Sequence, residues 1–131
     1  MKQFLIAGLM LSAPLIAQAP PAPADVSGAW TIHGSVAGVD VLEVCTFTQS
    51  TDAKLTGDCD VQGTKWPTTG AVKDADITFQ HSGKYNGDDY TITYHGKYDK
   101  DKSAFDGNMD VDPFGVSGDF TASRGTTVAA Q

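Results

Sequence analysis

Few residues of the 131-residue chain belong to types that commonly carry out chemistry: three histidines, two cysteines and 16 acidic residues, of which only Glu43 is a glutamate. The alternating strand pattern described below points His33 and His95 outward on non-neighbouring strands and His81 inward, which disfavours a histidine metal site. The chain contains no nucleophile elbow, Walker loop, dinucleotide-binding fingerprint or His-Glu-x-x-His motif. We therefore predict no catalytic residue, no metal, no cofactor and no enzymatic activity.

Acidic side chains gather on the outer face of one predicted strand, at Asp106, Asn108, Asp110 and Asp112. The predicted turns place Asp119 opposite Asn108 and His95 opposite Asp106. A surface cation site is one interpretation of this cluster. A solvated exterior that discourages self-association explains the same residues with fewer assumptions, and we adopt it.

The inward positions of the predicted strands are mostly aromatic. They carry Trp30, Phe47, Trp66, Phe79, Tyr90, Tyr94, Tyr98, Phe105, Met109 and Phe120, together with the polar residues Glu43, Thr68, His81 and Arg124. Such an interior is typical of a small-molecule site. The alternative is a barrel filled by its own side chains, with any pocket confined to one mouth. The ligand-binding residues that we predict are Trp66, Thr68, His81, Tyr90 and Tyr94.

The sequence leaves the orientation of Glu43 open. A β-bulge near Leu42-Glu43-Val44 would turn the carboxylate outward. Without a bulge, Leu42 and Val44 face solvent, where an outward apolar pair would suit a protein partner or a second copy of the chain.

The elements that position these residues are predicted by a recurring Gly-x-large phrase and by alternation with period 2, both typical of half-buried strands. Eight strands are expected, at 28–36, 39–49, 54–61, 66–72, 76–85, 89–98, 103–112 and 116–124. Between them lie short turn signals, of which Asn86-Gly87 is the clearest two-residue hairpin. No helix is predicted, since 15 of the 16 acids are aspartate, which favours turns over helix interiors.

The turns also predict registers that place large side chains opposite glycines. The expected pairs are Gly83–Tyr90, His81–Ile92, Phe79–Tyr94, Gly96–Phe105, Tyr94–Gly107, Ile92–Met109, Gly107–Phe120, Met109–Gly118, Trp66–Gly83 and Gly70–Phe79. The fold class is thus all-β, an eight-stranded antiparallel up-and-down barrel, because closure removes exposed edges. A two-sheet sandwich is the rival. Closure would bring the inward-facing Trp30 and Arg124 together, so that the guanidinium stacks on the indole.

The two cysteines are predicted to form a structural disulfide. The turn at Asp52 places Cys45 directly opposite Cys59, within disulfide reach. A redox or metal pair would favour a closer Cys-x-x-Cys spacing.

The N-terminus is typical of a secretory signal peptide: Met1-Lys2, an apolar run from Phe4 to Ile16 and an Ala-x-Ala site. Cleavage after Ala24 is favoured over cleavage after Ala19, which would leave Pro20 directly after the cut. The domains expected are therefore a signal peptide at 1–24 and one barrel at 25–131, ordered over about 27–125 and followed by a flexible C-terminal tail. The mature chain should be exported, to the periplasm or beyond, where a disulfide persists.

The net charge of −7 disfavours nucleic acid as a partner, because phosphates would be repelled. The apolar run near the N-terminus is too short to span a bilayer, and no later segment could do so.

Gly28-Ala29-Trp30 at the start of the barrel and Arg124 at its end resemble the calycin superfamily of lipocalins, fatty-acid binders and avidins. The resemblance implies a ligand-binding barrel. It does not extend to biotin, since Ile32 stands where the avidin pattern has asparagine and the late Trp-Lys of avidins is absent. The lipocalin helix before the last strand is also missing. The chain is also similar to small secreted inhibitors of bacterial metalloproteases, barrels that insert an N-terminal tail into the enzyme, but its tail before Val26 is very short.

These observations favour an exported lipocalin-like barrel that binds a small apolar or aromatic ligand without catalysis. The alternative is a protein-interaction module, such as an inhibitor of a secreted protease. The sequence does not specify the ligand, the protein partner or the oligomeric state.

Overall fold

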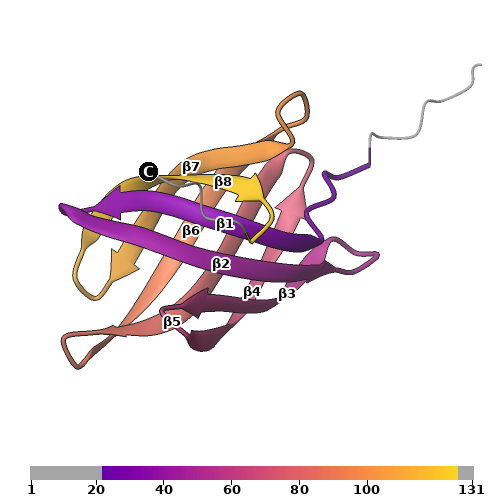
Figure 1. Cartoon of the computed structure of the whole chain (residues 1–131). Helices are drawn as coiled ribbons and strands as arrows, with labels where there is room; N and C mark the ends of the chain where they lie inside the picture. Colours follow the sequence, from indigo (N-terminus) through magenta and orange to yellow (C-terminus); the bar gives the residue numbers. More distant parts are fainter. Residues whose placement is uncertain (1–21, 127–131) are drawn as a thin grey trace, which may run out of the picture.

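A computed structural model describes residues 22–126 as a single closed β-barrel (Figure 1). Its eight strands are β1 (Gly28–Val36), β2 (Val39–Gln49), β3 (Lys54–Val61), β4 (Thr64–Lys73), β5 (Asp76–Tyr85), β6 (Asp88–Asp99), β7 (Ala104–Asp112) and β8 (Val116–Arg124). Each strand pairs with the next in antiparallel fashion, and β1 pairs with β8. The predicted fold class is thus confirmed, and the sandwich is excluded because the sheet closes on itself.

The tight turns lie where glycine or another residue adopts a positive φ. Asn86 and Gly87 have φ of 51° and 83°, the left-handed pair that a two-residue hairpin requires. Gln62 and Gly63 form a similar pair, with φ of 51° and 88°, and they extend β4 back to Thr64, two residues before its predicted start.

Most predicted registers are confirmed. Gly83 lies opposite Tyr90, Phe79 opposite Tyr94 and Gly107 opposite Phe120. The expected pair of Trp66 with Gly83 has the register observed between β4 and β5, where Gly70 lies opposite Phe79, but the ladder begins only at Thr68 and does not reach it. Pro67, which has no N–H to donate, follows Trp66 at that point. Strands β4 and β5 therefore stop pairing near the end that carries Trp66.

The predicted register between β6 and β7 is wrong by two residues. Tyr94 pairs with Met109, and His95 pairs with Asn108 instead of Asp106. The loop begins one residue later than expected, because Asp99 ends β6 and its Oδ1 accepts the Asp101 N–H at 3.0 Å. A shift of two residues leaves every side chain on its predicted face.

The middle of the barrel is a packed aromatic core. Phe79 stacks on Tyr94 with ring centroids 4.5 Å apart, and Phe120 meets Tyr94 edge-on at 4.9 Å. Phe105 packs edge-on against Trp30 at 4.7 Å. All five rings are almost fully buried, so the barrel centre is filled by its own side chains.

The end of the barrel near the start of β1 is closed by residues 24–27. Val26 is fully buried, and its carbonyl accepts a hydrogen bond from Trp30 Nε1 at 2.9 Å. The Arg124 guanidinium lies 4.3 Å from the centroid of the Trp30 ring and donates to the carbonyls of Asp25 and Ser27. The predicted contact between Trp30 and Arg124 is confirmed, with Arg124 on the exposed rim of this end.

Replacing Arg124 with methionine keeps an aliphatic cover on Trp30 but removes the stacked charge and both hydrogen bonds. We expect the free energy of unfolding to fall by about 1–2 kcal/mol, measured by urea denaturation. The matched control, Lys100→Met in an exposed turn, should change it by less than about 0.5 kcal/mol. Equal losses in the two variants would contradict a closing role for Arg124.

Within residues 22–126, no helix is long and apolar enough to cross a membrane. The predicted signal peptide lies almost wholly outside the described residues, and so does the predicted C-terminal tail beyond residue 126. Ala24, the last residue of that predicted peptide, accepts a hydrogen bond from Gln49 Nε2 at 2.9 Å.

Candidate functional site

The opposite end of the barrel carries a hollow at its rim. Its volume is about 380 Å³, and it is lined by Trp66, Ser82, Gly83, Asp89, Tyr90, Thr91, Asp112 and Pro113. It lies where β4 and β5 have stopped pairing, so that Trp66 is only half-buried. Gly83 leaves room for the ring of Tyr90, because a Cβ built on Gly83 would lie 2.4 Å from the Tyr90 hydroxyl.

The predicted ligand-binding residues occupy two layers. Trp66 and Tyr90 line the rim hollow and are partly exposed. Thr68, His81 and Tyr94 are buried, with exposed fractions of 3% or less, and do not line the hollow. The structure therefore brings two of the five residues to an accessible surface, and the other three belong to the buried interior.

Glu43 faces inward and is the centre of a buried polar network. Pairing between β1 and β2 is continuous, with Ile32 opposite Glu43, so no bulge turns the carboxylate outward. The Tyr94 hydroxyl donates to Glu43 Oε1 at 2.6 Å, and His81 Nε2 lies 3.1 Å from both carboxylate oxygens. A buried carboxylate needs such partners, since an isolated one would be strongly destabilising.

Both ring nitrogens of His81 face acceptors. Nδ1 lies 2.7 Å from the carbonyl oxygen of Ser82, and Nε2 lies against Glu43. Two acceptors call for two N–H donors, which only the protonated imidazolium provides. Burial lowers the pKa of His81, but the hydrogen bond and charge of Glu43 outweigh it, so the pKa is raised above 6.5. Burial and the charge of Glu43 raise the pKa of Tyr94 well above 10 and also raise that of Tyr90.

The ion pair of His81 with Glu43 predicts a specific pH dependence of stability. A histidine whose folded pKa exceeds its unfolded value near 6.5 stabilises the fold fully below pH 6.5, and the contribution is lost as pH rises through the folded pKa. We expect the contribution of this pair to the free energy of unfolding, measured by urea denaturation from pH 5 to 9, to stay constant up to about pH 6.5 and to fall at higher pH. The Glu43→Gln variant should show a flatter profile there. Parallel profiles for the two proteins would contradict the ion pair.

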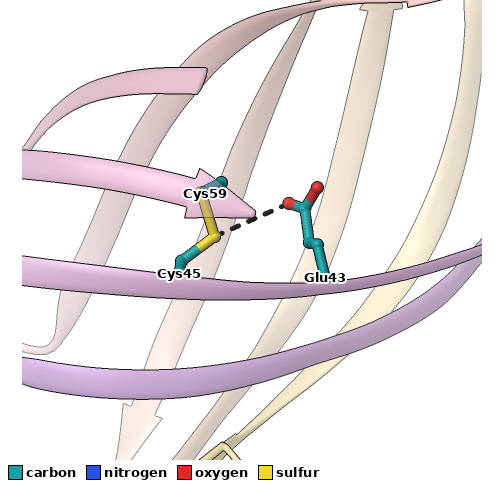
Figure 2. A group of neighbouring side chains, drawn as sticks. All are labelled: Glu43, Cys45 and Cys59. Atoms are coloured by element: carbon teal, nitrogen blue, oxygen red, sulfur yellow. Dashed lines mark hydrogen bonds between the residues drawn. A yellow bond between two sulfur atoms is a disulfide. The ribbon is translucent and has the colours of Figure 1, made fainter. Parts of the chain in front are cut away.

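The predicted disulfide between Cys45 and Cys59 is confirmed and lies beside this network. Figure 2 shows Glu43 Oε1 directed at Cys45 Sγ, 3.6 Å away. The carboxylate and the two sulfurs lie within 4.8 Å of one another, a spacing compatible with metal ligands. The two sulfur atoms are bonded to each other in the disulfide, however, whereas a cysteine binds a metal as a free thiolate. The cluster in this oxidised form is therefore structural.

A second, wider groove lies on the outer face of the barrel across β5 to β8. Its volume is about 770 Å³, and its polar lining includes His95, Lys97, Asp106, Asn108 and Asp119. The predicted pair of Asn108 with Asp119 is confirmed. His95 Nε2 lies 3.8 Å from Asp110 Oδ2, and both side chains are half-exposed. Among residues 22–126, this cluster does not bring three metal-ligating atoms together, as Glu43, Cys45 and Cys59 do.

Sequence reasoning missed several residues of the rim hollow. Asp89 and Asp112 lie on different strands and line the same hollow because β6 pairs with β7, with Thr91 opposite Asp112. The corrected register, which the loop after Asp99 decides, is what places Asp112 there. The turns in the sequence predict Met109 opposite Ile92, whereas the structure pairs Ile92 with Val111.

The fold and the candidate site define a small closed β-barrel protein, with one end closed by residues 24–27. The other end carries the rim hollow, and the network of Glu43, His81 and Tyr94 lies buried in the interior. A scan against protein-family models, a search of curated proteins and a search of solved structures each find no match to the chain. The barrel itself is compatible with the calycin-like expectation.

Proposed function

We propose that the chain is an exported, lipocalin-like barrel that binds a small apolar or aromatic ligand at the rim hollow, without catalysis. The observation that carries the proposal is the half-buried indole of Trp66 beside Tyr90 in a hollow of about 380 Å³. Small-molecule sites commonly have volumes from about 300 Å³ upward and use aromatic rings as their main contact surface. The disulfide is compatible with an oxidising, exported environment.

The buried network supports a binding role over a chemical one. The oxygens of Glu43 are already occupied by Tyr94 and His81, and these side chains are sealed from solvent. A general acid or base has to reach its substrate within hydrogen-bond distance. The network therefore serves as a buried structural element of the barrel, with its carboxylate out of reach of a substrate.

Replacing Trp66 with leucine should weaken ligand binding by about tenfold or more, since a large stacking surface is lost. The ligand would first be found by native mass spectrometry of the exported protein, as a mass excess that disappears on denaturation. The matched control is Tyr85→Leu, an exposed aromatic residue that does not line the hollow. A bare protein, or equal binding by the Trp66 variant, would overturn the proposal.

A protein-interaction module is the second candidate, favoured by Leu42 on the outer face of β2. Its side chain is 44% exposed, and Val44 beside it is half-buried. Inhibition by an inserted N-terminal tail has less support, because residues 24–27 fold back against the barrel. Loss of a partner from the Leu42→Lys variant in pull-downs from the exported fraction of the host would favour this candidate.

A further inference from the structure

The charged residues that line the rim hollow are all acidic. Two of its eight lining residues, Asp89 and Asp112, are carboxylates, and none is lysine, arginine or histidine. Asp112 has no ion-pair partner among residues 22–126. Asp89 Oδ1 lies 3.2 Å from Lys84 Nζ, but this pair is strongly exposed, with 61% and 82% of the two side chains accessible, and such pairs are weak. The hollow therefore presents a net negative charge to a ligand.

Aromatic residues line the same hollow as these two acidic residues. Trp66 and Tyr90 line the hollow, and the ring of Phe114, 42% exposed, lies 6.4 Å from that of Tyr90. The face of an aromatic ring is electron-rich and attracts cations within about 6 Å, most strongly for tryptophan.

The aromatic rings and the carboxylates of the rim hollow together favour ligands of one charge over ligands of another. A neutral aromatic ligand would stack on Trp66 but would leave the carboxylates beside it partly desolvated without a partner. An anionic ligand would be repelled by Asp89 and Asp112, and also by the acidic chain as a whole, with its net charge of −7. A ligand with a positively charged nitrogen satisfies both kinds of group at once.

We propose that the rim hollow recognises an organic cation, an ammonium group carried on an apolar or aromatic body. The ammonium binds at the rim against Asp112, and the apolar body covers the half-buried indole of Trp66 beside Tyr90. This inference rests on the proposed function and narrows its ligand class.

The experiment compares three ligands that share one aromatic ring: 2-phenylethylammonium, the neutral 2-phenylethanol and the anion phenylacetate. Each is titrated into the mature protein at neutral pH, and the Trp66 indole N–H resonance in ¹H–¹⁵N NMR spectra gives the dissociation constant. Trp30 is fully buried at the far end, so its indole resonance serves as an internal reference. We expect the ammonium to bind about tenfold more tightly than the alcohol, and the anion most weakly.

Variants separate a local site from general attraction to an acidic protein. Asp89→Asn with Asp112→Asn should reduce the preference for the ammonium to less than about threefold, whereas Asp106→Asn with Asp119→Asn, on the outer groove, should leave it unchanged. Equal binding of the alcohol and the ammonium, or tighter binding of the alcohol, would overturn the inference and leave the proposed function standing. Failure of all these ligands to shift the Trp66 resonance would overturn both.

Discussion

Replacing His81 with leucine is expected to lower the free energy of unfolding by about 3–5 kcal/mol, a large part of the stability of a small domain. The substitution removes the donor that lies 3.1 Å from both oxygens of Glu43 and leaves the carboxylate in the barrel interior, where its side chain is 2% exposed. Only the Tyr94 hydroxyl then remains to stabilise it. Urea denaturation followed by circular dichroism measures the change.

The double variant His81→Leu with Glu43→Gln tests whether the loss comes from the unpaired charge. Glutamine keeps an acceptor for the Tyr94 hydroxyl and removes the carboxylate, so more than half of the lost stability should return. The double variant also keeps the test decisive if His81→Leu does not fold. A double variant no more stable than His81→Leu would show that packing, and not the charge of Glu43, makes His81 necessary.

Removing the disulfide by Cys45→Ala with Cys59→Ala should lower the free energy of unfolding by about 3 kcal/mol, the value expected when a loop of about 15 residues is no longer closed. The two cysteines are 14 residues apart in sequence and lie on the paired strands β2 and β3. Both sulfurs are fully buried, so the loss of their packing adds to the effect. The measurement is again urea denaturation, at matched protein concentration.

A reductant supplies the control for the disulfide prediction. Reduction of the wild-type protein breaks the bond while keeping both sulfur atoms, so its stability should fall toward that of the double variant. The double variant has no cysteine and should not respond to the reductant. Wild-type protein that unfolds at the same urea concentration with and without reductant would contradict a stabilising role.

The sequence alone determined the architecture, because its signals are local. Alternation with period 2 fixes which face each side chain occupies, and turns such as Asn86-Gly87 fix where the chain reverses. These two signals were enough to predict the eight strands, the disulfide and the contact of Trp30 with Arg124. The predicted face of each side chain is insensitive to a register error of two residues, and the error between β6 and β7 therefore left every side chain on its predicted face.

The candidate site depended on features that no local signal carries. The inward turn of Glu43 required continuous pairing of β1 with β2, and its partners His81 and Tyr94 come from β5 and β6. The alternation of the sequence correctly predicted that Thr68, His81 and Tyr94 face inward. It does not distinguish a sealed interior from an accessible pocket, because that depends on how the side chains fill the barrel.

The formation of the rim hollow also depends on the tertiary structure. It exists because β4 and β5 stop pairing at Pro67 and because the register of β7 brings Asp112 beside Thr91. Registers and strand separations are set by hydrogen bonds between segments distant in sequence, together with the packing of the closed barrel. The sequence therefore specified the strands and the direction of each side chain, and the closed fold determined which side chains form a site.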